Sequence, residues 1–300
     1  MSADVVPAES GAPPGPFAEF VRAFAANRGA TLAFFVFLCV VLGALFAPWL
    51  APHDPVQQYR DAMLTPPAWQ AGGLAQFPLG TDELGRCLLS RLLHGARVSL
   101  LIGAAAVTLA LLPGVVLGLL AAFGNTWLSA AIMRVMDVLL ALPGLQLAIG
   151  VISILGPGLV NTVIAIAVGA LPGYVRLARG AALTEMARDH VTASRVAGAG
   201  TLRLMVITVL PNCLGPLIIN ATLGFSSAIL ETAALGFLGL GVQPPLPEWG
   251  SMLSAARDYI ERAPWVVTLP GLTILISVLS VNLMGDGLRD ALDPKLRSAS

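Results

Sequence analysis

The sequence predicts an all-α integral membrane protein with six transmembrane helices. Hydrophobic residues make up 56% of the 300-residue chain, and charged residues make up only 11%. A soluble domain usually carries about 25% charged residues, so a chain this poor in charge must face lipid over much of its surface. The mean hydropathy of +0.82 agrees, and long apolar runs reach the roughly 20 residues that cross a bilayer.

The six predicted spans follow from uncharged runs and from the glycine- and proline-rich breaks between them. The first run is too long for a cleaved signal peptide and follows acidic residues, which favours an uncleaved span. A longer run breaks at residues 124–126, and another breaks at Gly156-Pro157-Gly158. The predicted spans are residues 31–51, 98–123, 134–155, 159–178, 206–235 and 263–285.

The distribution of arginine and lysine predicts that both termini are cytoplasmic. With the N-terminus inside, eleven of the 17 basic residues fall in cytoplasmic segments, as the positive-inside rule requires. This orientation gives a cytoplasmic tail over residues 1–30, its first 16 residues disordered, and a periplasmic loop over 52–96. A transmembrane domain covers 97–286, with a cytoplasmic loop at about 180–205, and a cytoplasmic tail covers 287–300. Leu88, Leu92 and Leu93 predict an amphipathic surface helix in the outer loop.

Composition and cysteine content exclude several classes of protein. The net charge of zero disfavours a nucleic-acid binder, which needs a basic surplus. The three cysteines are too widely spaced for a disulfide framework or a metal motif, and Cys39 and Cys213 are expected to be structural. We therefore expect no metal site in this chain.

The cytoplasmic loop carries the most specific pattern. Thr184 is a suitable N-cap for a short helix, and Gly198 and Gly200 are suitable stops. Small residues and flanking arginines suit docking into the groove of a partner, but a helix resting on lipid headgroups fits the periodicity equally well. The polar face holds Glu185, Arg188, Thr192 and Arg195, and the stripe of mostly small residues holds Ala187, Val191, Ser194 and Gly198.

The stretch Thr192-Ala193-Ser194, followed by Gly198 and then Leu210-Pro211, resembles the EAA loop of permease subunits of type I ATP-binding cassette (ABC) importers. In that family pattern, glutamate stands at the position of Thr192 and alanine at that of Ser194. The resemblance implies that this segment is a coupling helix, which sits in a cleft of a separate ATP-binding subunit. The implied coupling residues are Glu185, Arg188, Val191, Thr192, Ala193, Ser194, Arg195, Gly198, Leu210 and Pro211.

Further segments are similar to the dipeptide/oligopeptide branch of this family. They begin at Pro78, Gly236, Pro247 and Gly285, with a short match at 134–137, and the resemblance covers about residues 31–297. It implies the second (C-type) permease subunit of an importer for peptides or related small solutes. The implied partners are a related permease chain, two ATP-binding subunits, a periplasmic solute-binding protein and membrane lipid. ATP and Mg²⁺ would bind the partner subunits, and this chain would bind no cofactor.

The chain has no ATP-hydrolysing motif of its own. A Walker A loop needs a lysine that follows a glycine run, and the only lysine, Lys295, has none before it. An intramembrane enzyme is disfavoured because neither G-x-S-x-G nor H-E-x-x-H occurs. An ion-coupled secondary transporter is the alternative, but clustered intramembrane acids and an internal repeat are missing.

Three charged residues within or beside the spans are candidates for function, because such groups are costly in a membrane. Asp137 follows Arg134 by one helical turn, so the two are expected to form a structural pair. Glu231 lies in the outer half of the fifth span, and it either faces a translocation path or bonds a neighbouring helix.

Overall fold

The computed structural model describes residues 15–292 of the chain. Within that range it is helical, without strands, and an isolated antiparallel bridge joins Thr81 to Cys87. The tail predicted to be cytoplasmic contains a helix, α1 (Pro16–Ala26). Residues 1–14, predicted to be disordered, and the end of the C-terminal tail, with Lys295 and Arg297, lie outside the described residues.

Five segments of the described chain are long and apolar enough to cross a membrane. Four of them are α2 (Arg28–Leu45), α4 (Leu88–Phe123), α7 (Leu159–Met186) and α12 (Trp265–Leu292). The fifth, Thr201–Phe237, combines the short α9 (Thr201–Arg203), a π-helical turn (Leu204–Val209) and α10 (Leu210–Phe237). A sixth crossing forms if α5 (Thr126–Leu140) and α6 (Gly144–Leu155), which meet at 90°, are one bent span.

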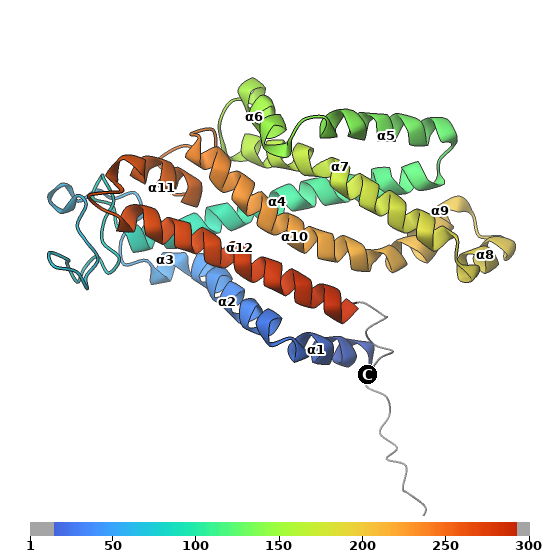
Figure 1. Ribbon diagram of the computed structural model, residues 1–300, viewed down its shortest axis with the longest axis horizontal. Coiled ribbons are helices and arrows are strands. Elements are labelled where there is room, and N and C mark those ends of the chain that lie inside the picture. Colours follow the sequence, from blue (N-terminus) through green and yellow to red (C-terminus); the bar gives the residue numbers. More distant parts are fainter. Residues whose placement is uncertain (1–14, 293–300) are drawn as a thin grey trace, which may run out of the picture.

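The bend between α5 and α6 corrects the prediction of one straight helix over residues 134–155. Pro143 stands at the N-cap of α6. Proline lacks a backbone N–H and disfavours helical conformation in the residue before it. The turn at 141–143 therefore ends α5 and sends α6 off in a new direction, as Figure 1 shows for the two green helices at the top.

The second crossing also starts earlier than predicted. Residues 88–97 are not a helix on the membrane surface but the first turns of α4, which begins at Leu88. Leu88 and Leu92 are buried in the protein, where they pack with residues of α11 (Trp249–Ala256) and α12. The leucines do lie on a helix, as their spacing predicts, but Leu88 and Leu92 pack against protein rather than against lipid.

Small residues bring α4 and α7 into close contact. A Cβ built on Gly118 would lie 2.6 Å from the Cβ of Ala178, and one built on Gly114 would lie 2.6 Å from the Cβ of Tyr174. Close approach at glycines four residues apart is typical of helix packing in membranes, where van der Waals contact replaces the hydrophobic effect. These two helices form the centre of the bundle (Figure 1).

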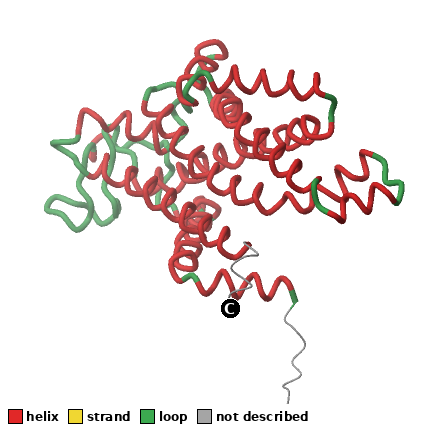
Figure 2. The backbone as a smooth tube through the Cα atoms, turned by 45° about the vertical axis from the view of Figure 1, so that its right-hand side comes forward, coloured by secondary structure: helices red, strands yellow, loops and turns green. Residues whose placement is uncertain are grey.

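The two ends of the bundle differ. One end carries most of the loop structure (Figure 2), including α3 (Ala47–Leu50), the segment that leads to α4, α11, and two 3-10 turns, Arg60–Ala62 and Arg257–Tyr259. The opposite end carries α1, the C-terminal end of α12 and the short helix α8 (Asp189–Val196) (Figure 1). The predicted cytoplasmic segments therefore share one end.

Candidate coupling site and solute path

The helix α8 projects from the end of the bundle, beyond the last turn of α7 (Figure 1). One side of α8 is held firmly, because Val191 is fully buried in a cluster with Leu204, Val209 and Cys213. The loop before α8 is held by charge. The buried Glu185 places one carboxylate oxygen 3.0 Å from the Nε atom of Arg188 and the other 3.2 Å from the Nε2 atom of His190.

Gly198 ends α8 in a Schellman motif, as the predicted stop requires. The N–H of Gly198 donates to the carbonyl of Arg195, and the N–H of Ala199 donates to that of Ser194. This arrangement needs a left-handed residue just after the helix, and Gly198 has φ of +87°. Glycine adopts that conformation without a steric cost, so it fixes the direction in which the chain leaves α8.

Two details of the predicted coupling helix are wrong. Thr184 is not an N-cap, because α7 continues through it to Met186 and α8 begins after Arg188. The stripe that contains Val191 does not face outward as a whole, because Val191 packs into the chain's own core. The exposed surface of α8 and its flanks instead comprises Ala187, Arg188, Asp189, His190, Thr192, Ala193, Arg195, Val196, Ala197 and Gly198, with Ser194 half-buried.

The predicted coupling residues Leu210 and Pro211 connect this segment to α10. Leu210 is half-buried against the same cluster as Val191, whereas Pro211 is exposed. Proline at the start of a helix costs no intrahelical hydrogen bond, and the π-helical turn before it is a feature frequently found at functional sites. A displacement of α8 would therefore reach α10 through shared packing.

The predicted pair of Arg134 and Asp137 does not form. The Asp137 carboxylate instead lies 2.6 Å from Arg176 of α7. Both side chains of this pair are about half exposed, and the pair joins α5 to α7. Spacing along one helix predicted the wrong partner, because the neighbouring helix brings a second arginine closer.

Glu231 lies half-buried in α10, at a cavity of about 200 Å³ between α4, α7 and α10. Among residues 15–292, no hydrogen bond or ion pair reaches its carboxylate. The sequence leaves two roles open for Glu231, and one of them, a bond to a neighbouring helix, does not form in the described residues. The geometry places the carboxylate at a cavity instead.

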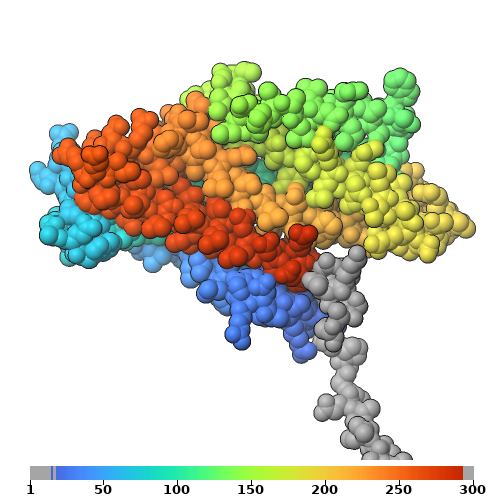
Figure 3. Space-filling view, in the orientation of Figure 1, coloured from blue at the N-terminus to red at the C-terminus, as the bar shows by residue number. Residues whose placement is uncertain are grey.

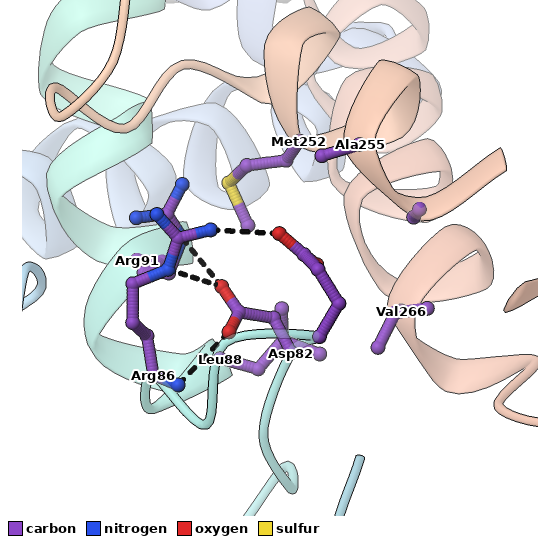
Figure 4. Close-up of a pocket in the computed structure, with 9 residues that line it drawn as sticks. Asp82, Arg86, Leu88, Arg91, Met252, Ala255 and Val266 are labelled. Carbon is purple, nitrogen blue, oxygen red and sulfur yellow. Dashed lines mark hydrogen bonds and ion pairs between the residues drawn. The ribbon is translucent and has the colours of Figure 1, made fainter. Parts of the chain in front are cut away.

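An ion network at the outer-loop end of the bundle was not predicted (Figure 4). Asp82 stands at its centre, with one carboxylate oxygen 2.6 Å from the Nε atom of Arg86 and 3.2 Å from that of Arg91. Arg86 also pairs with Glu83 at 2.9 Å, and burial raises the pKa of Glu83, with the charge of Asp82 adding to the effect. The network joins the outer loop to the first turn of α4. The sequence shows these residues within a family-like motif but does not show that they meet.

A second unpredicted contact joins α11 to α4. Glu248 is buried and caps α11 by accepting hydrogen bonds from the N–H groups of Gly250 and Ser251. The hydroxyl of Ser99 in α4 donates to the same carboxylate at 3.2 Å. The fully buried Trp249 donates its indole N–H to the carbonyl of Leu92. This end of the bundle is therefore tied together by polar contacts that a lipid environment could not replace.

An apolar helical bundle with five to six segments able to cross a bilayer defines a multi-pass membrane protein. Residues 114–298 match the family of binding-protein-dependent transport system inner membrane components. Residues 15–67 match the N-terminal transmembrane domain of oligopeptide transport permease C. The chain belongs to this family of ABC importer permeases, which confirms the predicted family and its branch.

Named relatives cover nearly the whole chain. The di/tripeptide transport system permease protein DppC of Pseudomonas aeruginosa is 66% identical, over 96% of this chain and 95% of its own length. The dipeptide transport system permease protein DppC of Escherichia coli K12 is 55% identical, over 95% of each chain. The structure resembles a chain of the inward-facing MetNI methionine ABC transporter, with a TM-score of 0.56 and 20% identity, over 70% of this chain and 96% of that one. The predicted all-α permease fold is confirmed.

Proposed function

We propose that this chain is one of two permease subunits of an ATP-driven importer of di- or tripeptides. The named relatives transport such peptides, and these relatives cover almost the full chain. The second permease would be a related chain, and a periplasmic solute-binding protein would deliver the peptide. This subunit would move between two conformations rather than perform bond chemistry.

One observation carries the assignment of the energy source. The helix α8 is rigidly held on one side by Val191 and presents an exposed face on the other, in which Val196 is 84% exposed. A firmly held short helix whose exposed face mixes arginines with small and apolar side chains suits docking into a groove of a partner. We assign this face, with Arg188, Thr192, Ala193 and Arg195, to a cleft of an ATP-binding subunit. ATP and Mg²⁺ would bind that subunit, and this chain would need no cofactor.

The same assignment sets the orientation. If α8 meets an ATPase, its end of the bundle lies in the cytoplasm. Both α1 and the C-terminal end of α12 lie at that end (Figure 1), so the two termini would be cytoplasmic as well. The loop that contains Asp82 and the helix α11 would face the periplasm, where the binding protein docks.

The test is the energy requirement of uptake. The chain is purified with its natural companions and reconstituted in vesicles that hold either ATP or no nucleotide, with or without a proton gradient, and labelled dialanine and binding protein are added outside. Uptake that needs internal ATP, and that survives collapse of the gradient, supports the proposal. Uptake that continues without ATP, or without a copurified ATPase, would refute it in favour of an ion-coupled transporter.

A further inference from the structure

Four polar residues recur on one side of α10, spread over most of its length. Asn212, Asn220, Ser227 and Glu231 fall within about 100° of the helix circumference, at 3.6 residues per turn. A different side of α10 lines an apolar groove through residues such as Leu214, Ile218 and Phe225. Polar groups inside a membrane normally face a bundle interior or a wetted cavity rather than lipid. The polar face of α10 therefore marks the wet side of this span.

The cavities of the bundle follow that polar face. The cavity at Glu231 is bounded by α4, α7 and α10, and in the space-filling view the hollow between α7 and α10 shows α4 at its floor (Figure 3). Asn220 lines both this cavity and a second one of about 560 Å³, which extends to Arg188 and Arg289. The two cavities together lead from Glu231 towards the end of the bundle that carries α8.

The cavity at Glu231 contains a second polar group without a partner. Tyr174 is only 2% exposed, and within the described chain its hydroxyl has no hydrogen-bond partner. A buried hydroxyl without a bond costs free energy. The ring is held in place, because its hydroxyl lies against Gly224, where any side chain would collide with it. Tyr174 lines the cavity and its hydroxyl has no partner, so a small shift of the ring would let the hydroxyl bond a molecule that enters.

The carboxylate of Glu231 is placed to attract a cation. A Cβ built on Gly144 would lie 3.6 Å from its Oε1 atom, so the carboxylate lies beside the first residue of α6. The N-terminal end of a helix favours negative charge. No basic side chain pairs with Glu231 in the described residues, and no arginine lines this cavity.

We infer that this cavity is a peptide-binding site in the translocation path, where Glu231 binds the α-ammonium group and Tyr174 donates to a backbone oxygen of the same peptide. The inference rests on the proposed function and names the chemistry of its solute. Glu231 lies seven residues after Gly224, which is about 10 Å along the helix axis. An extended peptide covers about 3.5 Å per residue, so a peptide of two or three residues matches the separation of these two positions along α10.

The experiment uses the complete importer in vesicles and measures the initial rate of dialanine uptake at saturating loaded binding protein. Glu231→Gln removes the charge and keeps the shape, and we expect uptake to fall at least about tenfold, since a hydrogen bond between charged groups is lost. Glu231→Asp keeps the charge and should restore part of the rate. Tyr174→Phe keeps the ring against Gly224 and should reduce uptake by about threefold to tenfold. Thr222→Val, on the side of α10 that faces the apolar groove, is the matched control and should stay within twofold of wild type.

The outcomes separate this inference from the proposed function. If the wild-type importer takes up no dialanine, the proposed function fails. If it does, and Glu231→Gln matches it, only the binding site is overturned. Equal rates for Glu231→Asp and Glu231→Gln would also overturn it, because charge would then be irrelevant. If the Glu231→Gln variant fails to copurify with its partners, the uptake rates of Glu231→Asp and Tyr174→Phe test the inference instead. Wild-type rates in both of these variants would overturn the proposed peptide-binding site.

Discussion

Replacing Gly198 separates the structure of α8 from its contact with a partner. Gly198 has φ of +87°, and a Cβ built on it meets no atom within 4 Å. Alanine or tryptophan there would pay about 1 to 2 kcal/mol for the left-handed conformation. The space around that Cβ is open, so neither the alanine nor the tryptophan side chain collides there with the rest of the protein. The two variants therefore share the same backbone cost and differ mainly in the bulk that they present outward.

The expected transport rates differ for that reason. A cost of about 1 to 2 kcal/mol changes a local equilibrium by a factor of about 5 to 30, but the burial of Val191 and the ion pair of Glu185 with Arg188 still hold α8. We expect Gly198→Ala to retain a substantial fraction of uptake. Gly198→Trp should lose nearly all of it, because the indole would occupy the space of the ATP-binding subunit.

The assay is ATP-driven uptake of dialanine by the complete importer, normalised to the amount of chain in the membrane fraction. Copurification of the ATPase is measured in parallel, and it should be weakened in Gly198→Trp alone. Uptake by Gly198→Trp within twofold of Gly198→Ala would refute the docking of this face. If both variants lost all uptake, the cause would be the altered backbone at the end of α8 and not a clash with a partner.

Two further substitutions and one double-mutant cycle test the contacts within the bundle. Asp82→Asn leaves the buried Arg91 without its charged partner, which should destabilise the protein by about 3 to 5 kcal/mol, seen as a lower Tm in detergent; an unchanged Tm would contradict the network. Gly118→Leu forces α4 away from α7, where a neighbouring Cβ would lie only 2.6 Å from the first added atom, and should cost at least about 1 to 3 kcal/mol, whereas full yield of folded protein would show that the two helices separate easily. A double-mutant cycle on Asp137 and Arg176 should give under about 1 kcal/mol, because both side chains are about half exposed; a coupling of several kcal/mol would mean that the pair is buried in the assembly.

Several features were predictable because they depend on local chemistry. Most spans were located from the length of apolar runs, which the thickness of a bilayer sets directly. Gly198 was identified as a helix stop because a left-handed residue favours glycine. The family was identified from short motifs in the right order, and the matches to known permeases confirm it.

Other features failed because they depend on which elements meet. Helical spacing paired Asp137 with Arg134, but the packing of α7 against α5 supplied Arg176 at 2.6 Å. The same spacing put Leu88 and Val191 on outward faces, but both are buried against other helices. A helical wheel identifies a face, but it does not identify the surface that the face meets.

The sequence alone determined that the protein faces lipid and roughly where its membrane spans lie. It also determined that the chain lacks an ATP-hydrolysing motif and where the projecting loop lies. Each of these follows from composition or from contacts within a few residues. Only the tertiary structure decided that Asp82 would join the outer loop to α4, and that Glu231 and Tyr174 would share one cavity. Tyr174 and Glu231 lie far apart along the chain, and their shared cavity arises from helix packing at small residues such as Gly114. Asp82 is close to Arg91 in sequence, but an irregular turn separates them, and no helical or strand spacing predicts their contact. Close packing between helices is a property of the assembled bundle, and no short segment contains it.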